Sequence, residues 1–222
     1  MIPAAPDCTA VEHRRPLGPE DQQRLSLRLP PPETSPRPAY ADRLQPSSLG
    51  WVTRPAWCVW IEPDPRPDLF SSRWRQAVDG ALGRWGRELA LQTVDHPDDA
   101  HVRIWRRRPP RLEGRASLGR ALLSLQMVRR AGTERLEPLV EVQRQGRWQL
   151  EPKVTVLISP GQAQPAIQAT ALHELGHGFG LWGHSDNPGD VMTAVPGPRP
   201  PSDLSPRDRD TLRWLLGRPS LF

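Results

Sequence analysis

One long stretch of the chain carries apolar residues at helical spacing. Counted from Trp74, apolar side chains fall at offsets of 0, 3, 4, 7, 8, 11 and 15. Such a stripe is typical of a helix that packs one face on a core. We therefore predict a helix from about residue 70 to residue 89, capped by Asp68, Ser71 or Ser72.

Several shorter segments have the composition or the alternation of strands. Residues 57–62 (WCVWIE) are β-branched and aromatic, and residues 89–94 and 101–107 flank a turn. Further strands are predicted from alternating apolar positions: Leu123, Leu125 and Met127; Val140 and Val142; Trp148 and Leu150, across a hairpin turn at residues 143–146; and Val154, Val156 and Ile158. The order of a strand, a helix, several strands and then the helix described below predicts a single α/β layer pair.

The first 50 residues have a different composition from the rest. They contain ten of the 28 prolines. Proline-rich polar segments bury too little apolar surface to fold alone. We therefore expect residues 1–50 to form a disordered arm and residues 51–222 to form the folded domain.

The net charge of +5 and the pI of about 10.4 come almost entirely from arginine, because Lys153 is the only lysine. The arginines are scattered, and only the stretch from Arg103 to Arg111 is dense. We interpret it as a solvated basic face and expect no nucleic-acid partner. The alternative is a binding module that contacts anionic partners through Arg103–Arg111.

The two cysteines, Cys8 and Cys58, do not indicate a disulfide framework. No apolar run is long enough for a membrane span. The N-terminus lacks the apolar core of a secretory signal, so the default expectation is a cytoplasmic protein, or a secreted or cell-envelope protein if the true start lies upstream. We expect a monomer.

The sequence HELGHGFGLWGHS at residues 173–185 carries the candidate chemistry. His173 and His177 are four residues apart, so a helix places both imidazoles on one face, where they can bind one Zn²⁺ ion. Glu174 points about 100° around the helix, beside a metal-activated water instead of on the metal. That is the position of a general base.

His184 is the expected third ligand, although it follows His173 by eleven residues where the best-known pattern has ten. The helix is expected to end near Gly180, and Gly183 gives the turn a permissive backbone directly before His184. The extra residue therefore falls outside the helix and leaves the first two ligands in place. Asp186 is the alternative third ligand.

The stretch from His173 to Met192 resembles the zinc-binding consensus of the metzincin metallopeptidases, most closely the matrixin-like peptidases of cyanobacteria and other bacteria. The resemblance covers roughly residues 51–217. It implies a twisted mixed β-sheet with an antiparallel edge strand packed on two helices, and a C-terminal helix at 204–217. It also implies a zinc endopeptidase that acts on polypeptides, with Met192 in a turn beneath the metal.

The chain departs from that family in three respects. No acidic, glycine-rich stretch with extra histidines is present, so structural Ca²⁺ or a second Zn²⁺ is not supported. The N-terminal region lacks the cysteine-switch pattern, and we interpret Cys8 as an incidental thiol instead of a zinc-blocking ligand. Residues 193–198 (TAVPGP) lack the tyrosine common after the methionine turn, so the wall of the specificity pocket is expected to differ.

Overall fold

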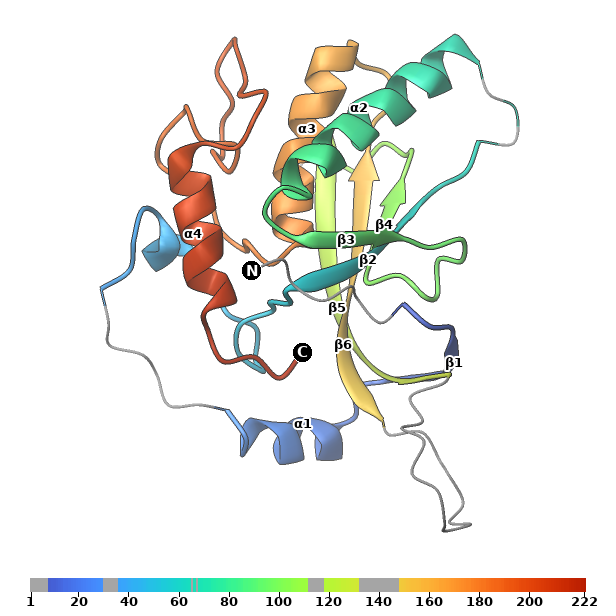
Figure 1. Cartoon of the computed structure of the whole chain (residues 1–222), viewed down its shortest axis with the longest axis vertical. Coiled ribbons are helices and arrows are strands. Elements are labelled where there is room, and N and C mark those ends of the chain that lie inside the picture. The colour runs from blue at the N-terminus through green and yellow to red at the C-terminus, as the bar shows by residue number, and fades with distance from the viewer. Residues whose placement is uncertain (1–7, 30–35, 65, 67, 112–117, 132–147) are drawn as a thin grey trace.

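A six-stranded mixed sheet is the frame of the protein in the computed structural model, which describes residues 8–29, 36–64, 66, 68–111, 118–131 and 148–222 (Figure 1). The strand order is β1-β5-β6-β4-β2-β3. Four neighbouring strands, β6, β4, β2 and β3, are parallel, while β5 is antiparallel to β6 and β1 is antiparallel to β5. The strands are β1 (Val11–Pro16), β2 (Ala56–Ile61), β3 (Ala90–Thr93), β4 (Val102–Trp105), β5 (Gly119–Arg130) and β6 (Gln149–Ile158).

The strand predictions that fall on described residues are confirmed in position, with one difference. Residues 149–158 form one continuous strand, where two short strands were expected. Pro152 is tolerated inside β6 because it precedes the residues, Val154–Leu157, that pair with β4. The predicted strand at Val140–Val142 and its hairpin turn lie outside the described residues.

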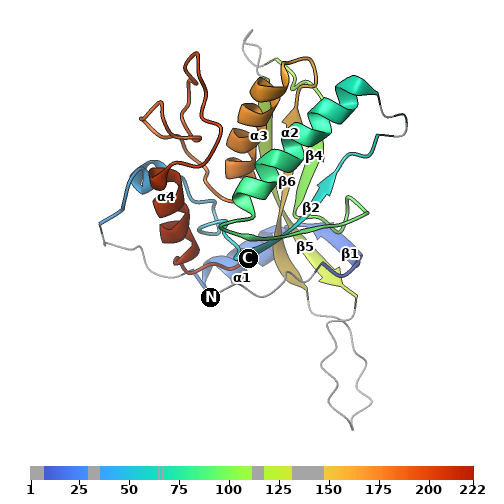
Figure 2. The same ribbon diagram turned by 45° about the horizontal axis from the view of Figure 1, so that its top comes forward.

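Two helices, α2 (Leu69–Trp85) and α3 (Gln164–Gly178), pack side by side on one face of the sheet (Figures 1 and 2). Asp68 caps α2 by accepting a hydrogen bond from the Ser71 amide. The helix ends at Trp85, four residues earlier than predicted, because Gly86 follows. The indole Nε1–H of Trp85 donates to the Leu172 carbonyl at 3.1 Å, which joins the two helices in the core.

The C-terminal helix α4 (Pro206–Leu216) lies within the predicted range. Ser205 caps it and accepts from the Asp208 amide. Leu212 and Leu215 are fully buried in the same core as α2 and α3. The helices in the part of the chain that the structure describes are all too short or too polar to cross a membrane.

The expectation of a disordered arm at residues 1–50 is wrong for the described part, which we call the N-terminal segment (residues 8–29 and 36–50). It contributes strand β1, helix α1 (Pro19–Ser26) and the short 3-10 helix η1 (Ala41–Arg43). Tyr40, Leu44 and Leu49 are almost fully buried. Tyr40 and Leu44 insert into the main core of the domain, and Leu49 packs with Leu25 against Met127 and Leu150 in a second, smaller cluster. Residue 51 is therefore no domain boundary.

The interpretation of Cys8 as an incidental thiol is also wrong. Cys8 and Cys58 form a disulfide, with their Cα atoms 5.7 Å apart, that ties the N-terminal segment to β2. A count of two cysteines cannot reveal their distance in the fold, and that distance decides whether they pair. Closing a loop of this size stabilises a fold by about 2–4 kcal/mol.

A buried group of charged side chains lies where the N-terminal segment joins the sheet. Arg130 donates from Nε to Glu151 at 2.8 Å, and Lys153 lies 3.1 Å from the same carboxylate. Arg130 also donates to the carbonyl of Thr9, next to the disulfide. His101 is fully buried beside them and accepts from the Cys58 amide, and burial lowers its pKa to about 4. These groups hold the start of the N-terminal segment, at Cys8 and Thr9, against the sheet.

Candidate metal centre

The helix α3 places His173 and His177 on one face, as the spacing predicted, with ring centroids 4.9 Å apart. The helix ends at Gly178, and the Leu181 amide donates back to the Gly176 carbonyl at 2.9 Å. Gly180 makes this exit possible because its φ of 106° lies in the left-handed region. A side chain there would also collide with the Val52 carbonyl, since a Cβ would lie 2.2 Å from that oxygen.

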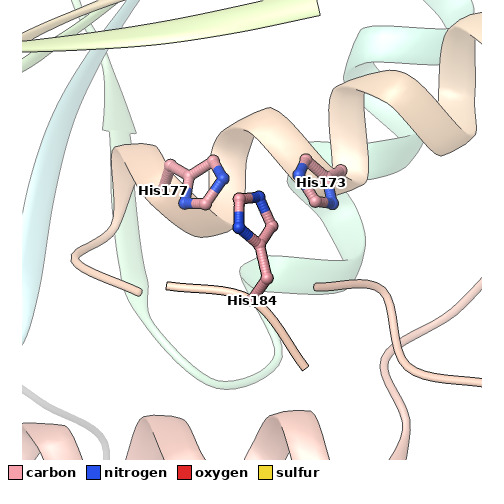
Figure 3. A group of neighbouring side chains, drawn as sticks. All are labelled: His173, His177 and His184. Atoms are coloured by element: carbon pink, nitrogen blue, oxygen red, sulfur yellow. The ribbon is translucent and has the colours of Figure 1, made fainter. Parts of the chain in front are cut away.

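His184 joins the two helical histidines, as Figure 3 shows, with the three rings converging from the helix and from the loop that follows it. Its ring centroid lies 5.3 Å from that of His173 and 5.0 Å from that of His177. One ring nitrogen of each histidine lies within 4.8 Å of the others. The eleven-residue spacing therefore brings three imidazoles together, and the group could hold a metal ion.

Gly183 is needed for a reason other than the predicted one. In the described residues the positive-φ glycines are Gly50 and Gly180, so Gly183 has no unusual backbone angle. Instead, a Cβ on Gly183 would lie 2.3 Å from the carbonyl oxygen of Arg43. The N-terminal segment packs directly against the loop here, and the Gln45 amide donates to the Trp182 carbonyl at 2.7 Å.

Asp186, the alternative third ligand, lies outside the histidine group. Its side chain is half exposed and forms ion pairs with Arg43 at 3.1 Å and with Arg207 at 2.8 Å. This carboxylate therefore links the N-terminal segment to α4, and the geometry favours His184 over Asp186 as a ligand.

The second ring nitrogens of the helical histidines are fixed by backbone carbonyls. His173 donates from Nδ1 to the Val191 carbonyl at 2.8 Å, and His177 donates from Nδ1 to the Leu181 carbonyl at 2.7 Å. These bonds leave Nε2 as the free ligand atom of each ring. Burial lowers the pKa of all three histidines, that of His177 to about 3, so the rings are neutral at neutral pH and can bind a cation.

Glu174 lies in the same cleft and is 9% exposed. Burial raises the pKa of its carboxyl group to about 7, although the Ala121 amide and the charge of Arg120 act in the opposite direction. The start of β5 approaches this side chain closely, since a Cβ on Gly119 would lie 2.6 Å from Glu174 Cγ. Gly119 and Ala121 were not predicted as site residues, because no motif marks them.

Met192 is fully buried beneath α3. A Cβ on Gly176 would lie 2.2 Å from its sulfur, so the methionine fills the space that this glycine leaves between the two helical histidines. The carbonyl of Met192 accepts from the Ser185 amide at 2.8 Å. The position of Met192 agrees with a turn that supports the histidine group from below.

Two buried carboxylates that the sequence did not indicate hold this turn in place. Asp208 accepts from the Tyr40 hydroxyl at 2.7 Å and from the Val191 amide at 2.9 Å. Because the Val191 carbonyl holds His173, Tyr40 is linked to a candidate ligand through two residues. Asp190 accepts from the hydroxyls of Ser185 and Ser205. The only sequence signal for Asp208 is its place three residues after Ser205, which is typical of a helix cap.

The histidines and Glu174 line a cleft of about 850 Å³. One side is the start of β5, and the other is the chain after Met192, with Ala194 and Pro196. Gln45 of the N-terminal segment also lines the cleft. Most of the remaining lining is apolar, so the cleft can hold an extended chain with apolar side chains.

Three of the five arginines in the Arg103–Arg111 stretch that the alternative function would use are paired with acids. Arg103 lies near Asp98, Arg106 donates to Asp64 at 2.8 Å, and Arg107 lies 3.4 Å from Glu62. None of them lines the cleft. These ion pairs reduce the attraction of the surface for an anionic partner.

No protein-family model matches this chain, and no curated protein matches it in sequence.

Proposed function

We propose that the protein is a zinc-dependent endopeptidase of the metzincin class, similar to the matrixin-like peptidases. One observation carries the proposal: three neutral imidazoles and a buried carboxylate with a raised pKa line the same cleft, beside the open edge of a β-strand. Metal ligands, a general base and a place for an extended peptide are the parts that metal-assisted peptide hydrolysis needs.

The donor set suits zinc, which accepts three neutral imidazoles in its catalytic sites. His173, His177 and His184 would hold the ion, and the carbonyls of Val191 and Leu181 orient the two helical rings for it. When bound, zinc supplies a Lewis acid that polarises a carbonyl group and acidifies a water molecule. The absence of structural Ca²⁺ or a second Zn²⁺ stays a prediction.

Glu174 is the proposed general base. Its carboxylate accepts a proton from the attacking water and then transfers it to the leaving amine. Because the pKa of this carboxyl group is close to neutral pH, the group can both accept and release a proton there. The Ala121 amide keeps the side chain oriented toward the start of β5, where the peptide would lie.

The open edge of β5 is the proposed binding site for the peptide backbone. The Leu118 carbonyl accepts from the Ser159 amide, so the even-numbered residues of β5 are the ones whose backbone N–H and C=O groups hydrogen-bond to β6. Odd-numbered residues, such as Leu123 and Leu125, therefore present their N–H and C=O groups to the opposite edge. Up to Leu125, no strand in the described residues pairs with that edge. A peptide can add a strand there.

The disulfide bears on the compartment. Disulfides persist in oxidising environments and are rare in the cytosol. The Cys8–Cys58 bond therefore favours a secreted or cell-envelope protein over the cytoplasmic default. Thiol labelling of protein from its native source tests this choice, and two free thiols would contradict it.

The experiment compares Glu174→Ala with the matched control Glu20→Gln, on the exposed surface of α1. Both variants should keep one zinc per chain. Only Glu174→Ala should lose turnover of an unfolded protein substrate, by about 10²–10⁴-fold. A zinc chelator should stop cleavage by the unaltered protein. Turnover that survives both the Glu174→Ala substitution and the zinc chelator would contradict the proposal.

A further inference from the structure

The edge of β5 is shared between the cleft and the N-terminal strand. On the side away from β6, β1 pairs with residues Gln126–Arg130. Glu174 meets the same edge at Ala121. Four residues of β5, Leu122 to Leu125, therefore lie between the reaction centre and the end of β1. Figure 1 shows β5 passing from beside α3 to β1.

The direction of β1 matters for a peptide on this edge. β1 is antiparallel to β5, with Val11 opposite Arg130 and Pro16 opposite Gln126. A peptide antiparallel to β5 would lie in line with β1, its N-terminal end directed at Pro16. The chain then leaves the edge at Leu17–Gly18 and enters α1. Anything that occupies the edge beyond Leu125 must displace this turn.

Several contacts fix β1 in that position. The disulfide anchors Cys8, and Arg130 holds the Thr9 carbonyl. The Val11 amide donates to Asp99 at 2.7 Å. Near the cleft, Arg15 pairs with Asp21 of α1 and lies 4.9 Å from the centroid of the Trp148 ring. These contacts make β1 a fixed part of the sheet instead of a segment that a peptide displaces.

We propose that β1 closes one end of the substrate edge, so that the protein grips about four substrate residues on the N-terminal side of the scissile bond. The number follows from the four residues Leu122–Leu125 of β5. The substrates are extended peptides for which contact with four residues on that side is sufficient. Residues further upstream do not contribute to recognition. This inference rests on the proposed function of the cleft.

A ladder of peptides tests the limit on the unaltered protein. The peptides share one scissile bond and carry one to eight residues before it. The value of kcat/KM should rise over the first four residues, by about twofold to fivefold at each of the alternate residues whose backbone pairs with Leu123 or Leu125 and by less at the residues between them. The fifth to eighth residues should change it by less than about twofold. The control adds the same residues after the scissile bond.

A pair of proline variants tests whether β1 sets the limit. Arg15 lies opposite Met127, an odd-numbered residue whose backbone faces β1, so the Arg15 amide donates into this ladder. Arg14→Pro, whose amide faces away, is the matched control. Arg15→Pro should loosen β1 and let the fifth and sixth residues raise kcat/KM further. Arg14→Pro should keep the limit at four.

The outcomes separate the two proposals. A gain that continues through the eighth residue on the unaltered protein would overturn this inference and leave the proposed function intact. An unchanged limit in a folded Arg15→Pro variant would show that β1 does not set it. If Arg15→Pro does not fold, the ladder on the unaltered protein decides. Failure to cleave any peptide would overturn the proposed function, and this inference with it.

Discussion

The metal-binding segment, residues 173–192, and the N-terminal segment meet at the cleft but are held in different ways. His173 and His177 are placed by one helix, and the exit turn at Gly180 is closed by a local backbone bond. The N-terminal segment is placed by partners distant in the sequence, from Cys58, 50 residues from Cys8, to Asp208, 168 residues from Tyr40. The first is a local structure, and the second depends on the finished domain.

The difference teaches that the candidate site is assembled from both kinds of structure. The Arg43 carbonyl lies so close to residue 183 that only a glycine fits there. Asp208 joins Tyr40 to Val191, the residue whose carbonyl holds His173. The N-terminal segment is thus part of the support of the metal centre.

Removal of residues 1–50 should have the largest effect. The deletion exposes the core surfaces that Tyr40, Leu44 and Leu49 cover, and each such side chain contributes about 1.5–3 kcal/mol when buried. It also removes the disulfide and β1. We expect loss of cooperative thermal unfolding, followed by circular dichroism, because the sum approaches the total stability of a domain. A truncated chain that melts cooperatively and binds zinc would restore residue 51 as a domain boundary.

The Gly183→Ala substitution tests the contact between the two segments directly. The new methyl group would lie 2.3 Å from the Arg43 carbonyl oxygen, so either the N-terminal segment or His184 must move. We expect a loss of about 1–3 kcal/mol in the free energy of unfolding and weaker zinc binding. Gly161→Ala is the matched control, since a Cβ there meets nothing within 4 Å. Equal behaviour of the two variants would argue against a tight contact.

These two segments also show what the sequence could and could not predict. The helix of α2 and the strands β2 to β6 follow from periodicity, and the histidine group follows from the motif, because each depends on neighbours in the chain. The contacts of Tyr40, Cys8 and Asp208 are made with side chains distant in the sequence. No local pattern shows which distant residues come together in the fold. Proline content led to the wrong prediction of a disordered arm, because composition does not show whether a segment packs on a core built by the rest of the chain.

Acid should destabilise the anchor of the N-terminal segment at pH values where His101 is still neutral in the folded protein. His101 has a pKa of about 4 when buried, below its unfolded value, so its stability contribution is present above about pH 6.5 and is lost as the pH falls toward 4. Between pH 7 and pH 5 we expect His101 to account for a loss of about 2 kcal/mol. Denaturant titrations of the metal-free protein should show this loss on top of that from His173, His177 and His184, whose pKa values are also lowered. His101→Gln should make the slope shallower by its own share, and His96→Gln, at an exposed position, should leave the slope unchanged.

The smallest effect is expected for Tyr40→Phe. This change keeps the buried ring and removes one hydrogen bond to Asp208, which also holds the Val191 amide. We expect a loss of about 1 kcal/mol in the free energy of unfolding, and a decrease in zinc affinity smaller than tenfold. An unchanged affinity together with reduced stability would show that Tyr40 supports the fold alone and not the ligand His173.

The most direct test of the central claim is a zinc titration that compares His184→Ala with Asp186→Ala. The three imidazoles converge, while Asp186 is paired with Arg43 and Arg207, so His184→Ala should lower zinc affinity by several orders of magnitude. Asp186→Ala should lower it by no more than about 10–100-fold, as for a group that only supports a ligand. If Asp186→Ala releases the metal while His184→Ala retains it, the histidine triad is not the metal site and the account is wrong.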